Sequence, residues 1–286
     1  MKTKKARASF GLLVLAFGLV LAGCSGQPAA TPTPTPKPVT RDMALEHALQ
    51  EQLAKIDPVA VPIYNQATQA LDAGDDAAAK KLYEMVTVRA PGFSAAYRRL
   101  GYIQSKENDL SGAIALTQKA VDIEPNAYNQ TALAALLLQK NTPADSQEAF
   151  KLASSAAKVL PDDDQTQLVL LMSAAAVNNG AVAHQADQHL LELTPNSSLG
   201  HYFAGLLAAK DGNPEEAESQ MQTAQSLGMS PATVQQALAG GISQNAFNAR
   251  MWRWTLIAVA VVLLGLGIFF IARRPRVENR RRPRPR

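Results

Sequence analysis

Cysteine is almost absent from this chain of 286 residues, which contains only Cys24. A single cysteine excludes an intrachain disulfide framework, a CxxC redox pair and a zinc site built from a cysteine cluster. Whatever domain the chain forms must therefore be held together by the packing of its side chains.

The residue patterns of common enzyme sites are also missing. We find no Gly-rich phosphate loop, no nucleophile elbow and no motif of paired acids, and turns account for the recurring glycines and aspartates. The four histidines form no i, i+4 pair and no HExxH arrangement, so we expect solvated or structural roles for His47, His184, His189 and His201. The sequence predicts no enzymatic activity, no metal and no cofactor.

Three consecutive acidic residues, Asp162 to Asp164, could suggest a calcium site. They follow Pro161, where a helix is expected to begin, and acidic side chains there interact favourably with the positive end of the helix dipole. We therefore interpret them as helix-capping residues.

Residues 1–23 have the pattern of a secretory signal peptide. Four basic residues precede an apolar run from Phe10 to Ala22, which ends at small residues. As a helix this run is about 20 Å long, too short to cross a hydrocarbon core of ~30 Å comfortably. A cleaved signal explains it better than a permanent span.

The signal ends in Leu21-Ala22-Gly23-Cys24, which resembles the lipobox of bacterial lipoproteins. That resemblance implies a diacylglycerol group on the thiol of Cys24 and cleavage just before it. The alternative is an ordinary signal followed by a small buried or free thiol.

Residues 252–271 predict a transmembrane helix, because they match the ~20 apolar residues that a span requires and carry no charge except Arg253 at the outer edge. Trp252 and Trp254 are expected at the membrane interface, where amphipathic rings concentrate. Arg273 and Arg274 mark the other interface.

The basic tail, residues 272–286, contains eight arginines and is predicted to be cytoplasmic. It could bind anionic lipid headgroups or serve only to fix the topology. Residues 25–249, in contrast, contain 14 basic and 23 acidic residues, a net charge of −9, although the whole chain carries +4. No nucleic-acid partner is therefore expected.

Residues 24–39 form a linker whose prolines alternate with threonine from Thr31 onward. Such a segment favours polyproline II at about 3.1 Å per residue. We interpret it as a stalk rather than a partner-binding proline motif, since it lacks aromatic or basic anchors.

Residues 40–240 predict an all-helical domain. Apolar residues recur at helical spacing, interrupted by short runs of Gly, Asn, Asp or Pro. Helix-ending prolines recur 34, 36, 34 and 36 residues apart, which indicates a repeat: Pro91, Pro125, Pro161, Pro195 and Pro231. The predicted repeats are 60–93, 94–127, 128–163, 164–197 and 198–231, and a short linker, 241–251, follows the domain.

These repeats resemble those of the tetratricopeptide repeat (TPR) family, which are helix pairs with small residues at positions 8, 20 and 27 and proline at position 32. Counted from Ser94, the second repeat places these residues at Gly101, Ala113, Ala120 and Pro125. It departs from the family at Gln104 and Thr117, where bulky residues are commoner. The resemblance implies a right-handed α-solenoid of about five helix pairs with capping helices near residues 40–56 and 232–238.

In this family the first helix of each pair lines a concave groove that binds peptides. Mapping the groove positions gives the candidate binding residues Tyr64, Thr68, Arg98, Tyr102, Lys106, Asn129, Leu136, Gln139, Gln165, Met172, Tyr202, Leu206 and Lys210. Tyr64, Tyr102 and Tyr202 could anchor a peptide. Arg98, Lys106, Asn129 and Lys210 could hold its carboxylate, or be ordinary solvated residues.

The prediction for function is a bacterial, membrane-anchored scaffold that binds an exported or membrane protein or peptide in this groove. The repeat domain is expected outside the cytoplasmic membrane, with the tail in the cytoplasm. The alternative is an accessory subunit of a membrane complex, contacted through the transmembrane helix.

Overall fold

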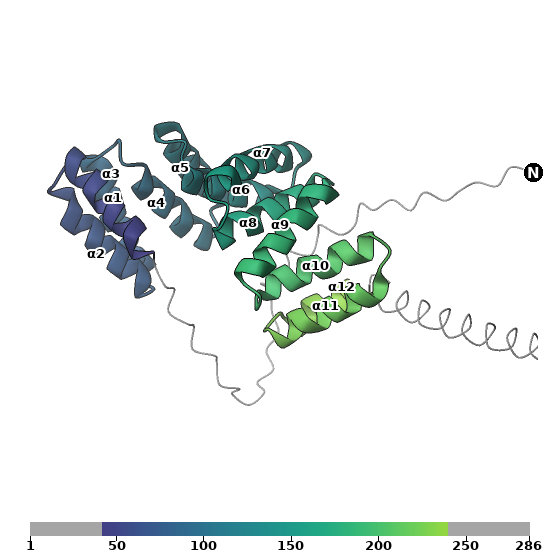
Figure 1. The fold of residues 1–286 in the computed structure, drawn as a ribbon. Helices are drawn as coiled ribbons and strands as arrows, with labels where there is room; N and C mark the ends of the chain where they lie inside the picture. The colour runs from purple at the N-terminus through teal and green to yellow at the C-terminus, as the bar shows by residue number, and fades with distance from the viewer. Residues whose placement is uncertain (1–41, 240–286) are drawn as a thin grey trace, which may run out of the picture. The chain divides into compact units, whose positions relative to one another are not determined.

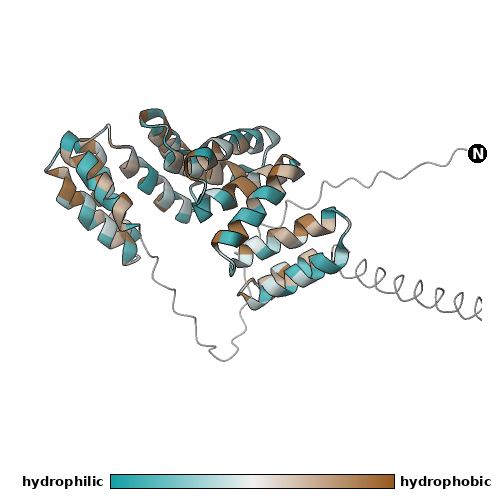
Figure 2. Ribbon diagram, in the orientation of Figure 1, coloured by the Kyte–Doolittle hydropathy of each residue, from teal (hydrophilic) through white to brown (hydrophobic). Residues whose placement is uncertain are grey.

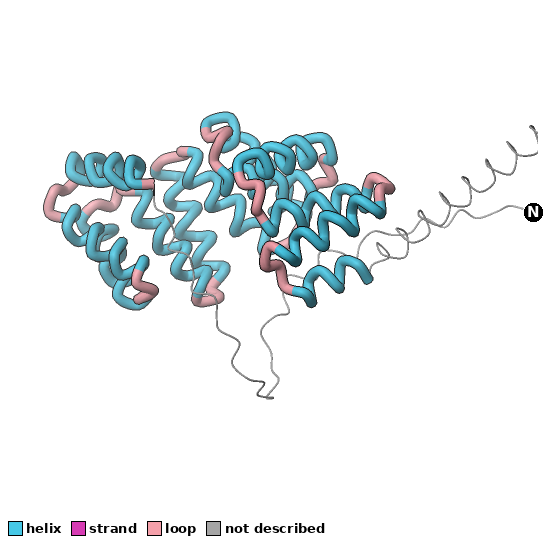
Figure 3. The backbone as a smooth tube through the Cα atoms, turned by 60° about the horizontal axis from the view of Figure 1, so that its bottom comes forward, coloured by secondary structure: helices cyan, strands magenta, loops and turns pink. Residues whose placement is uncertain are grey.

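The computed structural model describes residues 42–239, and every regular element in that range is a helix (Figures 1 and 3). The chain divides into two compact units, Met1–Phe203 and Ala204–Arg286. The boundary falls within helix α10 (Ser198–Lys210), and each unit is described by itself.

The described part of the first unit consists of α1 to α9 and the start of α10. The bounds are α1 Met43–Ile56, α2 Ala60–Asp72, α3 Asp76–Arg89, α4 Ser94–Lys106, α5 Leu110–Ile123, α6 Ala127–Lys140, α7 Pro143–Val159, α8 Asp164–Ala176 and α9 Gly180–Leu193. From α2 to α9 successive helices pack as pairs. We call α2, α4, α6, α8 and α10 the first helices and their partners the second helices.

Side-chain caps define where the second helices of the first unit begin. The carboxylates of Asp75 and Asp109 accept hydrogen bonds from backbone N–H groups three residues on, at 3.0 and 2.9 Å. Asp163 does the same for first helix α8, accepting from the N–H of Thr166 at 2.8 Å and from its hydroxyl at 2.6 Å. Capping at this acidic run is therefore confirmed for Asp163.

The turn inside each pair places a residue in the left-handed region. Within the first unit these residues include Gly74, Asn108 and Asn178, with φ of 77°, 63° and 58°. Asparagine and glycine are the residues that adopt this conformation at least cost. Their spacing reproduces the repeat of the sequence.

Small residues allow the paired helices to approach closely. A methyl group built on Gly101 of α4 would lie 2.2 Å from the hydroxyl of Thr117 and 3.0 Å from the carbonyl oxygen of Ala113, both on α5. Side chains at these positions must therefore be small, as the family resemblance implies.

The core shared by α1 to α4 is built around an aromatic cluster. Tyr64 meets Tyr83 and Phe93 edge-on, with ring centroids 5.7 and 5.3 Å apart. Leu49 and Leu53 of α1 belong to the same cluster of buried residues. Brown and teal residues alternate along these helices, as expected for helices with one buried face (Figure 2).

The described part of the second unit contains the end of α10, α11 (Pro214–Ser226) and α12 (Pro231–Ala237). Gly205 approaches the carbonyl oxygen of Ala217, since a methyl group built on it would lie 3.1 Å away. Val234 of α12 is fully buried.

Within residues 42–239 no helix is both long and apolar enough to cross a membrane. The predicted span 252–271, its interface residues Trp252, Trp254, Arg273 and Arg274, and the predicted lipidation site Cys24 lie outside the described residues.

Candidate protein-interaction face

The surface formed by the first helices of the first unit carries a set of accessible polar and aromatic side chains, which we call the first-helix face. Tyr102, Lys106, Gln139 and Gln165 are exposed, and Tyr102 keeps 53% of its surface accessible. Thr68, Arg98, Met172 and Tyr202 are half-buried. In the second unit, Leu206 is half-buried and Lys210 is exposed.

Three residues expected in an open groove lie instead in the interior: Tyr64, Asn129 and Leu136. The amide of Asn129 donates to the carbonyl oxygens of Ala120 and Glu124, at 3.2 and 2.8 Å, and so caps the end of α5. It is therefore not available to bind a peptide carboxylate. The family positions mark one side of each first helix, but part of that side is covered by neighbouring helices.

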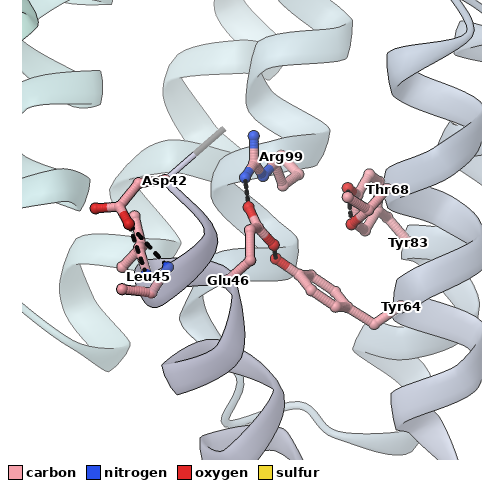
Figure 4. A network of polar contacts seen from close by, with 8 residues as sticks. Asp42, Leu45, Glu46, Tyr64, Thr68, Tyr83 and Arg99 are labelled. Atoms are coloured by element: carbon pink, nitrogen blue, oxygen red, sulfur yellow. Dashed lines mark hydrogen bonds and ion pairs between the residues drawn. The ribbon is translucent and has the colours of Figure 1, made fainter. Parts of the chain in front are cut away.

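Tyr64 is fully buried, and α1 shares in its surroundings together with Tyr83 and Phe93 (Figure 4). Its hydroxyl donates to Glu46 Oε2 at 3.1 Å, and Arg99 of α4 donates to Oε1 of the same carboxylate. Burial, opposed by Arg99, raises the pKa of Tyr64 to about 12, so the phenol remains protonated and continues to donate.

Arg98 lies beside this network, and the positive charge of its guanidinium group is only partly compensated. Its guanidinium carbon is 5.8 Å from the centre of the Tyr128 ring, and its Nε has no hydrogen-bond partner. Burial, together with the charge of Arg99, lowers its pKa to about 10. Two adjacent arginines therefore give the region between α2 and α4 a positive charge, which is offset only by the carboxylates that reach this region.

Glu124, just after α5, supplies a second carboxylate nearby. Ser94 donates to its Oε2 at 2.7 Å and Gln52 of α1 at 3.2 Å. Burial opposes the charge, but these hydrogen bonds outweigh it and lower the pKa of the Glu124 carboxyl. Helix α1 therefore makes polar contacts with residues beyond its immediate neighbour α2.

The exposed end of α4 has a different arrangement. Lys106 Nζ is 2.5 Å from Asp76 Oδ2 and 5.8 Å from the centre of the Tyr102 ring. The hydrogen bond to Asp76 raises the pKa of Lys106. Because this cation already has a carboxylate partner, the accessible group at this position is the ring of Tyr102.

A shallow open depression, about 490 Å³ in volume, lies farther along the first unit. Its lining comes from the start of α8, the end of α9 and the loop that follows: Asp164, Gln165, Leu168, Leu190, Thr194, Pro195, Asn196 and Ser197. Gln165 is the predicted groove residue among them. In the described residues no group of three or more His, Cys, Asp or Glu side chains could hold a metal ion.

The sequence did not predict where α1 packs. We expected this helix only to cap the domain. Leu45, Leu49 and Leu53 recur at helical spacing, and this signal shows that one face must be buried. It does not show which residues cover that face. The contacts of Glu46 and Gln52 across the chain could be found only in the structure.

Comparison with solved structures identifies the repeat architecture. YrrB, described as a TPR protein with an unusual peptide-binding site, aligns over 68% of this chain and 99% of its own, with 17% identity and a TM-score of 0.51. The fold is a TPR-like α-solenoid. MamA from Desulfovibrio magneticus RS-1 has a TM-score of 0.51 at 15% identity, covering 60% of this chain and 96% of its own.

A third protein, the thermophilic TPR protein TTC0263 of Thermus thermophilus, has a TM-score of 0.50 at 17% identity and covers 64% of this chain and 98% of its own. No protein-family model and no curated protein sequence matches the chain. Identities this low establish the TPR-like fold alone, so the function has to be argued from the residues on its surface.

Proposed function

We propose that this protein is a non-catalytic scaffold that binds a protein segment on its first-helix face. The observation that carries the proposal is the exposure of the Tyr102 side chain. Among the described residues, seven large hydrophobic side chains are exposed, and Tyr102 is the one that lies on a first helix. Tyrosines are enriched at the centres of protein interfaces because the ring is apolar and the hydroxyl can form hydrogen bonds.

The neighbouring side chains suit a mixed interface. Gln139 and Gln165 are exposed on α6 and α8, so they could form hydrogen bonds with a peptide backbone. The pairing of Lys106 with Asp76 limits the charge that this end of the face offers. The partner contact there is therefore expected to be mainly aromatic and polar rather than electrostatic.

The sequence supports a location for this scaffold. We propose that Cys24 is lipidated, that residues 252–271 cross the cytoplasmic membrane, and that the TPR-like domain lies on the extracytoplasmic side. Its partner is then an exported or membrane protein.

A matched pair of triple variants tests the proposal. One variant carries Tyr102→Ala, Gln139→Ala and Gln165→Ala on first helices; the other carries Met85→Ala, Val88→Ala and Val159→Ala, which are exposed on second helices. Proteins cross-linked to each full-length variant in native membranes are quantified by mass spectrometry. We expect a partner that is retained by the second variant and depleted at least about tenfold in the first, equivalent to about 1.4 kcal/mol.

Equal retention by both variants would contradict the first-helix face as the binding surface. That result would favour an accessory subunit contacted through the predicted transmembrane helix, and the same comparison would then be made with substitutions in residues 252–271.

A further inference from the structure

Helix α1 is placed differently from the second helices of the repeat. Second helices α3, α5 and α7 each pack on the first helix of their own pair and on the next first helix. Helix α1 precedes α2, yet Glu46 reaches Arg99 of α4 and Gln52 reaches Glu124 after α5. These side-chain contacts extend past α2–α3 to the next pair, so α1 packs on α2 and also reaches first helix α4.

Helix α1 contacts one residue that the family pattern assigns to the binding groove and approaches another. Tyr64 and Arg98 are predicted groove residues on α2 and α4, and Glu46 accepts from the first and lies near the second. A peptide bound to these positions would occupy the space that α1 occupies. Figure 4 shows Glu46 between Tyr64 and Arg99.

Helix α1 contributes few residues to the core that it shares with α2 to α4. Helix α1 buries only Glu46, Leu49 and Leu53, and its first residue, Met43, is 73% exposed. A buried ion pair such as Glu46–Arg99 contributes little net stability, because desolvation of both charges offsets their attraction, but it does distinguish strongly between acidic and basic occupants.

The cationic side of the contact is not fully satisfied even with α1 in place. Nε of Arg98 and Nε of Arg99 are both buried and lack hydrogen-bond partners. Without α1, the carboxylate of Glu46 would leave, and the two arginines would face a site that only Glu124 partly neutralises. Such a site favours a ligand that brings a carboxylate.

We propose that α1 occupies the partner site in cis, and that the partner is an amphipathic helix that displaces it. This inference rests on the proposed function and specifies its ligand: a carboxylate side chain followed three and seven residues later by leucine-like side chains. That spacing is the one at which Glu46, Leu49 and Leu53 meet the site. Helix-in-groove recognition commonly uses such apolar residues on one helical face.

A synthetic peptide with the sequence of residues 43–56 provides the probe, and the full chain in nonionic detergent provides the site. Glu46→Lys places a cation beside Arg98 and Arg99 and should release α1. Glu51→Lys, at an exposed position of the same helix, makes the same change of charge and is the matched control.

We expect hydrogen exchange in residues 43–56 to accelerate in Glu46→Lys and to stay unchanged in α4 to α9. The Glu46→Lys chain should bind the peptide at least about tenfold more tightly than the unmodified and Glu51→Lys chains. Adding Arg99→Glu to Glu46→Lys should restore protection of α1 and remove peptide binding. A peptide carrying lysine in place of glutamate at the Glu46 position should not bind Glu46→Lys.

Unchanged exchange in residues 43–56, or peptide binding no tighter than that of the Glu51→Lys chain, would overturn the proposal. If Glu46→Lys loses its helical circular dichroism, Glu46→Gln replaces it as the test variant, because glutamine keeps the shape of the side chain. The proposal then requires the Glu46→Gln chain to bind the peptide at least about threefold more tightly than the unmodified chain does. The two proposals fail separately. Partner retention that depends on Tyr102 without peptide binding refutes only the role of α1.

Discussion

Asp187 is an acidic residue at a position where burial disfavours its charge. It occupies α9 in a buried position, with 7% of its surface accessible, and its Oδ1 has no hydrogen-bond partner. Burial raises the pKa of its carboxyl to about 6, although His184 on the same helix and His201 on α10 oppose the shift. The charged form is therefore disfavoured by folding.

Replacing this carboxyl should change how stability depends on pH. The folded-state pKa lies above the unfolded value of about 3.9, so ionisation of Asp187 reduces the free energy of unfolding progressively between about pH 4 and pH 6. Asp187→Asn should therefore gain about 2 kcal/mol relative to the unmodified chain on going from pH 4 to pH 7.5. Urea unfolding at both pH values measures this gain, with exposed Asp122→Asn as the control. An equal difference at both values would contradict it.

Gly101 provides a second test at this scale. Gly101→Ala should lower the free energy of unfolding by about 1–3 kcal/mol, because the added methyl group has no room beside Thr117 and Ala113. Thr117→Ala removes the hydroxyl that lies nearest. A double-mutant cycle measured by urea unfolding should thus show part of the loss recovered in the double variant; strictly additive effects would indicate that the helices simply move apart.

At the scale of the helices, the periodicity of the sequence predicts most of the arrangement. Proline spacing and small residues predicted helix pairs, and the all-helical TPR-like fold is confirmed by the helices observed and by the solved structures that the chain matches. The left-handed turn residues could have been predicted too, since Gly74, Asn108 and Asn178 stand at equivalent places. The position of α1 could not, because its leucine stripe fits many apolar surfaces.

The turn residue Asn108 has a defined requirement that substitution can test. Asn108→Val should destabilise the chain by about 1–2 kcal/mol, because a β-branched residue is strained at a φ of 63°. Asn108→Gly adopts this φ without strain and should leave the free energy of unfolding within about 0.5 kcal/mol of the original. Urea unfolding of the two variants compares them directly. Equal losses would mean that the side chain of Asn108, rather than its backbone, matters.

For the whole molecule, the fold was predictable from the sequence, but the exposure of the candidate binding residues was predictable only in part. Exposed Tyr102, Gln139 and Gln165 are where the family pattern placed them, whereas Tyr64 and Asn129 are buried. The pattern specifies which side of a first helix is used by relatives, but a helix from elsewhere in the chain, such as α1, can cover that side.

The proposed membrane location gives a prediction that concerns the complete chain. Cys24→Ser should abolish incorporation of labelled fatty acid and leave the chain in the membrane fraction, since the predicted helix 252–271 holds it there far more strongly than one lipid would. Fatty-acid labelling and fractionation measure both effects. Release of the Cys24→Ser chain into the soluble fraction would contradict the predicted span.

The central claim is that the first-helix face contacts the partner, and site-specific photo-cross-linking tests it most directly. A photoreactive residue replaces Tyr102 in one full-length chain and Val88, which is 83% exposed on second helix α3, in another. Both are irradiated in native membranes. We predict a cross-linked partner from position 102 that position 88 does not yield. The same products from both positions, or none from position 102, would contradict binding on the first-helix face.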